Sequence, residues 1–594
     1  MSLLGEIKRR RVVQVGVLYG VVAWALVEIV ATIEEPLGLP TWVDTLVIVL
    51  ALVGFPLAMI LSWAFDVTPQ GVVRTPSTDE PEASASAQAP PFPAAPSAGV
   101  SAESPAPKPA VLRNSVAILP LENLSPNPDD AYFAAGIHEE ILNYVAKIQD
   151  VNVIARTSVK RYAGSDKPIG EIAAELGVGT IMEGSVRYAG ERVRVTAQLI
   201  DAATENHLWS DVYERELADI FAIQADIAEN IAAALEAELS SATKKKIETP
   251  TTESPEAYAL YLRAMAIIQE YGWSNASVPE VRVMARSWLD QAIAADADFA
   301  LAYVQRGRLL GALLNQDPGE LENYEERRAE MERLALADLE KAMQLDPSIG
   351  AAHAAMARIH QFNWRGKEAA AEYALAMELS PNDPITIIDF AIFTAITGNP
   401  ARAVKLAQRS ASLNPNDAQV HMGMSMIHLH NADVESAVET ERRSAELAPS
   451  AGLPHVILGH LEKMTGNHTE ALKQARIAEE LLRDDMNPTY LGELICVYAR
   501  LDMREDAERL FGQVEDLAKK RRVPALVWLL SYMALGDDEQ AYRWLKTLVK
   551  QREPYVSFFS TVNHVVGNIY RYPLLDEPRV KALRDGFGFQ DLRR

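Results

Sequence analysis

Residues 381–415 read PNDPITIIDFAIFTAITGNPARAVKLAQRSASLNP, and this stretch decides the fold because it repeats. Its boundary proline recurs every 34 residues along the chain, at Pro347, Pro381, Pro415 and Pro449. A leucine keeps the same step at Leu345, Leu379, Leu413 and Leu447, and an alanine keeps it at Ala335, Ala369, Ala403, Ala437 and Ala471. Three residue types in phase over several periods indicate a structural unit that is stacked many times.

A period of 34 residues, with small residues inside the repeat and a closing proline, resembles the tetratricopeptide repeat. The resemblance implies a helix pair for each period, and stacked pairs form a superhelix with a concave groove. When Ala403 is set to position 20, positions 8 and 27 also hold small residues, as Ala391 and Ser410 show. We expect seven or eight repeats over residues 250–555, followed by a C-terminal cap over 556–594.

The same resemblance assigns the groove face of each repeat to particular positions of its first helix. A groove of this kind suits a helix or an extended peptide of a partner protein, and methionines give an adaptable contact surface. The alternative is that part of this stripe packs against neighbouring helices. The candidate protein-binding residues are Arg358, Gln361, Phe362, Ile388, Ile392, Met422, Met426, His430, His460 and Lys463.

A group of soft side chains, His421, Met424, His428 and His430, has the composition of a metal site. The repeat register favours another interpretation, because His353 and His360 occupy the equivalent positions two repeats earlier. Those positions lie between the paired helices. We therefore interpret the histidines as packed side chains and expect no metal and no cofactor.

Composition limits the function further. The 594 residues carry a net charge of −24, which argues against a nucleic-acid partner because phosphate contacts need a basic surface. Cys496 is the single cysteine, so no internal disulfide can form. The sequence also contains no phosphate-binding loop, no nucleophile elbow and no zinc-protease motif. We expect no catalytic residues and no enzymatic activity.

An α/β domain is expected over residues 113–245. Buried or half-buried strands are predicted at 115–121, 151–158, 180–188 and 192–200, and helices at 130–148, 169–176 and 221–235. In the stretch 192–200, Val193 and Val195 alternate with Arg194 and Thr196, so one face of this strand should meet water.

Several motifs of this domain resemble the TolB amino-terminal-like (FlgO-like) domains of bacterial membrane proteins. They are Ser115-Val-Ala-Ile-Leu-Pro-Leu121, Tyr132-Phe-Ala-Ala-Gly136, Ala155-Arg-Thr-Ser158, Glu183-Gly-Ser-Val-Arg187, Gln198-Leu-Ile-Asp201, Leu208-Trp-Ser210 and Ile220-Phe-Ala-Ile-Gln224. The resemblance implies membrane helices first, then this domain, then tetratricopeptide repeats. Relatives often add an output module such as a nucleotide cyclase, a kinase or a DNA-binding domain. The sequence departs from the family pattern at Ala135, where an acidic residue is usual.

The first 66 residues predict a membrane hairpin. Apolar runs at 12–33 and 42–65 are each long enough to span a bilayer as a helix, and the basic residues before the first run place the N-terminus in the cytoplasm. Gly16 and Gly20 could pack this helix against the second one or against another copy in a homodimer. The bland alternative is that they are ordinary membrane glycines. A proline-rich linker, 67–112, would tether the rest.

The expected fold class is therefore a multi-domain chain with a two-helix membrane hairpin, a small α/β domain and an all-α tetratricopeptide-repeat superhelix. The expected location is the bacterial inner membrane, held through the lipid bilayer, with both termini and the soluble domains in the cytoplasm. The alternative places those domains in the periplasm. We expect an adaptor or signalling scaffold that binds a protein or peptide partner and no nucleic acid. The alternative function is a regulatory or sensor subunit working with a separately encoded cyclase, kinase or transcription factor.

Overall fold

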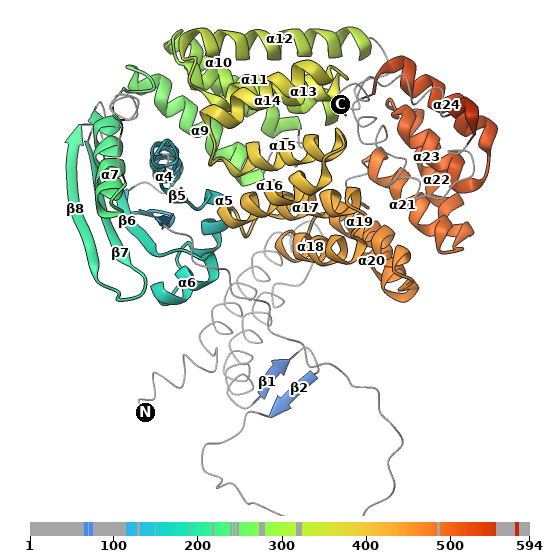
Figure 1. Ribbon diagram of the computed structural model, residues 1–594, viewed down its shortest axis with the longest axis horizontal. Coiled ribbons are helices and arrows are strands. Elements are labelled where there is room, and N and C mark those ends of the chain that lie inside the picture. The colour runs from blue at the N-terminus through green and yellow to red at the C-terminus, as the bar shows by residue number, and fades with distance from the viewer. Residues whose placement is uncertain are drawn as a thin grey trace, which may run out of the picture. The chain divides into compact units, whose positions relative to one another are not determined.

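Figure 1 shows the computed structural model of the chain, which divides into two compact units, residues 1–104 and residues 105–594. In the first unit, strands β1 (Phe65–Thr68) and β2 (Gly71–Arg74) pair antiparallel, with Val67 opposite Val72. The structure describes residues 65–68, 71–74, 114–126, 131–148, 150–189, 192–216, 219–237, 240, 244, 249–271, 279–316, 324–483, 487–553 and 577–580.

The membrane part of the expected fold class requires correction. Among the described residues, no helix has both the length and the apolar character needed to cross a bilayer. This finding overturns the membrane hairpin and the inner-membrane localisation, and neither is retained. The run at 12–33, with Gly16 and Gly20, lies outside the described residues, as do the run at 42–65 up to residue 64 and most of the expected linker.

The second unit begins with a mixed β-sheet. Its main strands run in the order β5-β3-β6-β7-β8, and β4 pairs with β6. Strands β5, β3, β6 and β4 pair in parallel, whereas β6, β7 and β8 pair antiparallel. The bounds are β3 (Ser115–Ile118), β4 (Glu122–Asn123), β5 (Asn152–Val153), β6 (Thr180–Ala189), β7 (Arg192–Asp201) and β8 (His207–Glu216).

Helices cover both faces of this sheet. Helices α4 (Ala131–Ala146) and α7 (Ile220–Ala234) share one core with Val116 and Ile118 of β3. On the other face, α5 (Arg156–Val159), η2 (Lys160–Tyr162) and α6 (Ile169–Leu176) share a second core with Ala117 and Leu119. Both faces of β3 are buried, and its residues Val116, Ala117 and Ile118 form an uninterrupted apolar run.

The structure confirms most of the expected elements of this domain and corrects two. Helix α6 has the expected bounds, and β7 buries Val193 and Val195 while Arg194 stays exposed. The strand expected at 151–158 is wrong, since only Asn152 and Val153 pair and the chain then leaves the sheet as α5. Strand β8 was not predicted, because most of its residues are exposed and show no alternation.

The rest of the second unit is an all-helical superhelix of tetratricopeptide repeats (Figure 1). In the described residues it comprises eight helix pairs with the bounds α9 (Pro255–Tyr271), α10 (Pro279–Ala295), α11 (Ala300–Gln316), α12 (Tyr324–Leu345), α13 (Gly350–Phe362), α14 (Gly366–Leu379), α15 (Pro384–Ile396), α16 (Pro400–Leu413), α17 (Ala418–His430), α18 (Val434–Leu447), α19 (Gly452–Met464), α20 (His468–Leu481), α21 (Pro488–Arg500), α22 (Arg504–Ala518), α23 (Ala525–Leu535) and α24 (Asp538–Gln551).

Local chemistry explains why these helices begin where they do and pack in pairs. The Asp383 carboxylate accepts hydrogen bonds from the Ile385 and Thr386 amides at 3.4 and 3.1 Å, and Pro384 begins the helix. The alanine series is fully buried, with 0% exposure at Ala335, Ala369, Ala403, Ala437 and Ala471. A small side chain at this position lets the two helices of a pair approach closely.

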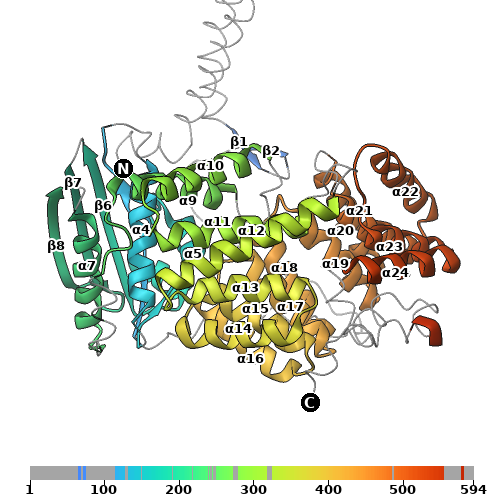
Figure 2. The ribbon, with the colours of Figure 1, turned by 90° about the horizontal axis from the view of Figure 1, so that it is seen from above.

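The first helix pair is joined to the α/β domain by a continuous hydrophobic core. Tyr258 and Phe299 pack in the same cluster as residues of α4 and α7, and Figure 2 shows α9 and α10 beside α4. Gly136 of α4 permits this approach, because an added Cβ would lie 2.4 Å from Leu262 Cδ2 of α9. The glycine of the Tyr132–Gly136 motif therefore serves contact between the two domains.

The last helix pair packs back against an earlier one. Trp364, in the link between α13 and α14, donates from Nε1 to the Glu553 carbonyl oxygen at 3.1 Å. Leu526 and Leu529 of α23 lie in one hydrophobic cluster with Tyr373 of α14. The array therefore closes on itself, because its last helix pair contacts the third pair. Of the expected C-terminal cap, only 577–580 is described, and Val580 joins this cluster.

Candidate functional site

The ten candidate groove residues lie on the first helices of four successive pairs, α13, α15, α17 and α19. The structure divides them by burial. Three are buried, with exposures of 4% for Gln361, 4% for Ile388 and 5% for His460. The others keep a partly or fully exposed side chain: Arg358, Phe362, Ile392, Met422, Met426, His430 and Lys463.

The buried three contact neighbouring helices. Gln361 accepts a hydrogen bond from the Tyr373 hydroxyl at 3.0 Å. Ile388 packs against Gly423, where an added Cβ would lie 2.7 Å from its Cγ1 atom. His460 Nε2 lies 3.2 Å from the Glu493 carboxylate, and burial lowers the pKa of this histidine. For these residues the alternative interpretation, packing within the array, describes the structure.

A short apolar strip remains accessible on α15 and α17. It consists of Ile392, Met422 and Met426, and we call it the inner strip. Gly423 lets the two helices approach closely, because a Cβ atom added to this glycine would lie only 3.3 Å from Ile392 Cδ1. The close approach places Ile392 beside the segment of α17 that carries both methionines.

Polar side chains stand on the helices at either side of the inner strip. Arg358 of α13 lies 3.5 Å from the Asp389 carboxylate and 6.0 Å from the ring centroid of Phe362. Lys463 of α19 lies 3.1 Å from His468 Nε2. An apolar centre with charged flanks is the arrangement that many peptide-binding surfaces use.

The histidines of α17 make contacts within the protein. His421 Nε2 lies 2.9 Å from the Pro415 carbonyl oxygen, and His430 Nδ1 lies 2.8 Å from the Met426 carbonyl oxygen. Burial lowers the pKa of both imidazoles, so both are neutral at pH 7. These contacts confirm the interpretation of His421 as a packed side chain.

A second contact between the domains uses the Ala155-Arg-Thr-Ser158 motif, which the sequence associated only with a family resemblance. The Ala155 amide donates to the Leu413 carbonyl oxygen at 2.9 Å. The hydroxyls of Thr157 and Ser158 both donate to Asn414 Oδ1, at 2.7 and 2.6 Å. The motif thus binds the turn between α16 and α17.

Neighbouring turns of the array extend this contact, which we call the domain junction (Ala155–Ser158 with residues 414–416). The Asn416 amide donates to Ser158 Oγ at 2.8 Å. One turn earlier, Asn382 Nδ2 lies 3.5 Å from the Val151 carbonyl oxygen. Asn382 and Asn416 each follow a repeat proline and are 34 residues apart, and that spacing was a signal available in the sequence.

Ionisable side chains also gather beside the domain junction. Arg156 Nε lies 3.6 Å from Glu139 Oε2. Burial raises the pKa of Glu139, and the charges of Arg156 and of Arg308, from α11, oppose that rise. Burial also raises the pKa of the neighbouring Glu140 to about 7. The charge of Arg308, from the repeat array, therefore acts on Glu139 of the α/β domain.

Comparison with known proteins relates part of the chain to one curated protein. No family model matches the chain. It is 40% identical over 172 residues to a protein of Rhizobium meliloti (strain 1021) named putative adenylate cyclase 3, and the match covers 29% of this chain and 29% of that protein. The chain thus spans less than a third of this relative, and the relation concerns a segment only.

Solved structures of other repeat proteins also resemble the chain. YrrB, described as a tetratricopeptide-repeat protein with an unusual peptide-binding site, is 21% identical and covers 33% of this chain and 94% of its own, with a TM-score of 0.24. Pseudomonas aeruginosa PilF is 21% identical, with coverages of 37% and 91% and a TM-score of 0.29. Human IFIT1 with PPP-AAAA is 14% identical, with coverages of 64% and 83% and a TM-score of 0.39.

Proposed function

We propose that this chain is a protein-binding repeat scaffold that holds an apolar segment of a partner polypeptide against the inner strip. The observation that carries the proposal is the partial exposure of Ile392, Met422 and Met426 on adjacent first helices. A repeat array that needed these side chains only for its own packing would bury them, as it buries Ile388.

The chemistry of the inner strip suits a helix or an extended peptide with two or three apolar anchors. Methionine side chains are unbranched and polarisable, so they adapt to anchors of different shape. Arg358 and Lys463 stand on the flanking helices and would favour acidic residues next to the anchors. Backbone contacts of a partner would add affinity without adding specificity.

The test uses peptides selected for binding to the wild-type chain from a random peptide library. We expect the Met422→Glu, Met426→Glu double variant to bind these peptides about 30-fold more weakly, because each carboxylate would be desolvated against an apolar anchor. Fluorescence anisotropy of labelled peptides measures the change. Far-UV circular dichroism and the melting temperature establish that the variant folds.

A matched control places the same substitutions on exposed apolar side chains of second helices. Met284 of α10 is 43% exposed and Leu375 of α14 is 42% exposed. The Met284→Glu, Leu375→Glu variant should bind the selected peptides as the wild type does. Equal binding by all three proteins would remove the inner strip from the proposal, because the peptides would then bind elsewhere.

We also propose a second role, regulation of a separately encoded nucleotide cyclase. The observation that favours it is the 40% identity over 172 residues to the protein named putative adenylate cyclase 3. A shared segment of that length is long enough to make the same regulatory contact with a cyclase in both proteins. In this proposal, the repeat array or the α/β domain would bind the cyclase and change its activity.

Cyclic nucleotide levels in a cyclase-deficient bacterial strain test this second role. Cyclases encoded beside the gene of this chain would be expressed alone and together with it. We expect the chain to change the level of at least one product several-fold, while the chain alone makes none. No change with any cyclase would reject regulation, and synthesis by the chain alone would show that it is itself an enzyme.

A further inference from the structure

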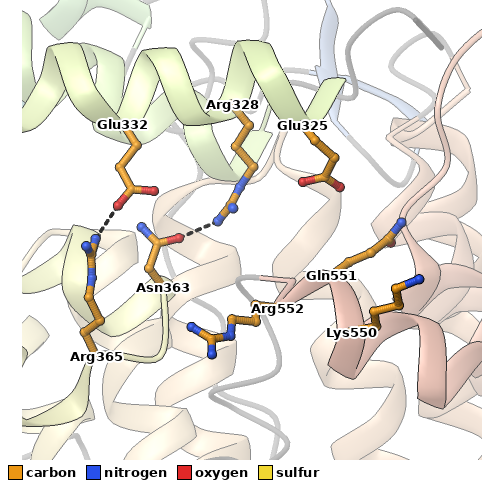
Figure 3. Close-up of a pocket in the computed structure, with 8 residues that line it drawn as sticks. All are labelled: Glu325, Arg328, Glu332, Asn363, Arg365, Lys550, Gln551 and Arg552. Carbon is orange, nitrogen blue, oxygen red and sulfur yellow. Dashed lines mark hydrogen bonds and ion pairs between the residues drawn. The ribbon is translucent and has the colours of Figure 1, made fainter. Parts of the chain in front are cut away.

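A cavity lies where the array closes on itself, away from the inner strip. It has a volume of about 510 Å³ and is bounded by α12, by the link between α13 and α14, and by the end of α24 (Figure 3). Its lining residues are Glu325, Arg328, Glu332, Asn363, Arg365, Lys550, Gln551 and Arg552. We call it the closure pocket.

The closure pocket carries a charge opposite to that of the whole chain. Four of its side chains are cationic and two are carboxylates, which gives a net charge of 4 − 2 = +2. The complete sequence has a net charge of −24. A positive site on an acidic protein is a local feature that the overall composition does not explain.

Donors in the closure pocket outnumber the acceptors around them. Arg328 Nη2 donates to Asn363 Oδ1 at 2.6 Å, and Arg365 donates to the Glu332 carboxylate. In the described part of the chain, three further buried donors, Arg328 Nε, Asn363 Nδ2 and Arg365 Nε, form no hydrogen bond. An unpaired buried donor costs about 1–3 kcal/mol, so these groups favour an acceptor that enters the cavity.

Lys550 and Arg552 complete the positive side of the closure pocket. Both are exposed, and within the described residues neither side chain forms an ion pair or a hydrogen bond. Arg552 has a left-handed backbone with φ of 48°, and Figure 3 shows its guanidinium reaching from the end of α24 toward the α13–α14 side. Cations near a helix C-terminus also balance the helix dipole, but Arg328 and Arg365 come from other elements.

We propose that the closure pocket binds a small phosphate-bearing molecule. A phosphate dianion matches the net charge of +2, and guanidinium groups bind phosphate oxygens with paired hydrogen bonds. The volume of about 510 Å³ lies within the range of about 300–1,000 Å³ that small-molecule sites occupy. It leaves space for an organic group or a second phosphate.

Binding in the closure pocket would hold the closure together. Arg328 belongs to the second helix pair, Arg365 to the third and Arg552 to the end of the eighth. One anion that contacts all three would therefore link distant parts of the array beside the Trp364–Glu553 hydrogen bond. A ligand that binds only the closed array should stabilise the closed array by mass action, and closure should in turn strengthen ligand binding.

Isothermal titration calorimetry of the full chain with inorganic phosphate, pyrophosphate and citrate, at constant ionic strength, tests the proposal. We expect saturable binding of pyrophosphate with a Kd at or below about 1 mM. The Lys550→Gln, Arg552→Asn variant should bind at least about tenfold more weakly, because two charge-assisted contacts are lost. Both residues are exposed, and asparagine tolerates the left-handed backbone, so this variant should fold.

The control removes the same charge from the same helix, outside the cavity, as Arg543→Asn, Lys546→Gln. It should bind pyrophosphate as the wild type does, and hydrogen exchange should show that pyrophosphate protects residues 363–366 and 550–553. Absence of saturable phosphate or pyrophosphate binding, or an equal loss in both variants, would overturn the site. Citrate binding as tight as pyrophosphate binding would overturn the phosphate assignment in favour of a carboxylate ligand.

Discussion

At pH 8, the Glu441→Gln variant is expected to be more stable than the wild type by on the order of 3 kcal/mol. Glu441 lies on α18, is 0% exposed, and has no ion-pair partner among the described residues. Burial raises the pKa of its carboxyl group to about 8, and the Ser425 hydroxyl offsets part of that rise. Glutamine keeps the shape of the side chain and cannot ionise.

The pH dependence has a definite sign. The folded protein binds the Glu441 proton more tightly than the unfolded chain, in which the pKa is about 4.5, so stability falls as pH rises from about 4.5 to about 8. At pH 5 the variant and the wild type should differ little. Glu140, whose pKa burial raises to about 7, adds to the same slope in both proteins.

Urea unfolding followed by circular dichroism at pH 5, 6.5 and 8 measures this difference. Glu439→Gln is the matched control, because Glu439 is exposed on the same helix. Its unfolding free energy should stay within about 0.5 kcal/mol of the wild type at every pH. Parallel stability curves for Glu441→Gln and the wild type would show that the buried carboxyl finds a partner and is not destabilising.

The Asn414→Ala variant is expected to open the domain junction. Asn414 and Ser158 are 1% and 0% exposed, and the variant removes the acceptor of both the Thr157 and the Ser158 hydroxyls. The loss should amount to about 2 kcal/mol, which corresponds to roughly 30-fold less hydrogen-exchange protection over residues 155–162. The repeat itself tolerates alanine here, since Ala448 occupies the equivalent position of the next repeat.

Ser380→Ala supplies the control, because Ser380 is the equivalent residue of the preceding repeat. It should leave exchange over residues 155–162 unchanged. Asn414 also donates to the Asp417 carboxylate at 3.0 Å, so a small loss at the start of α17 is expected in Asn414→Ala. Loss confined to α17, with α5 unchanged, would mean that the hydroxyl contacts do not hold the domains together.

The sequence predicted the parts of the fold that local chemistry determines. The alanine series marks the helix pairs because a small side chain is required at the same place in each pair. The inner surface was predicted less well, since position in a repeat does not tell how closely neighbouring first helices approach. Gly423 lets α15 and α17 approach closely, and this approach buries Ile388. The burial depends on the distance between two helices, which the repeat position of Ile388 does not determine. The membrane hairpin was inferred from the hydropathy of the first 66 residues and from the family resemblance.

The contacts that join distant segments could not be predicted from one sequence. Trp364 and Glu553 are separated by 189 residues, and their contact depends on the small rotation between pairs, summed over several repeats. The closure pocket exists only because this accumulated rotation brings the last helix pair back to the third. The domain junction had a weak signal in the asparagines that follow the repeat prolines, but no pattern indicated which segment would contact them.

An open stack of helix pairs frays from its tips, because the terminal pairs have only one neighbour each. Here neither tip is bare: the first pair shares its core with α4 and α7, and the last pair packs on the third. Unzipping therefore has no free end from which to start. We therefore expect the array to resist gradual unfolding from its ends. Once one of these end contacts breaks, the early and late repeats should unfold together.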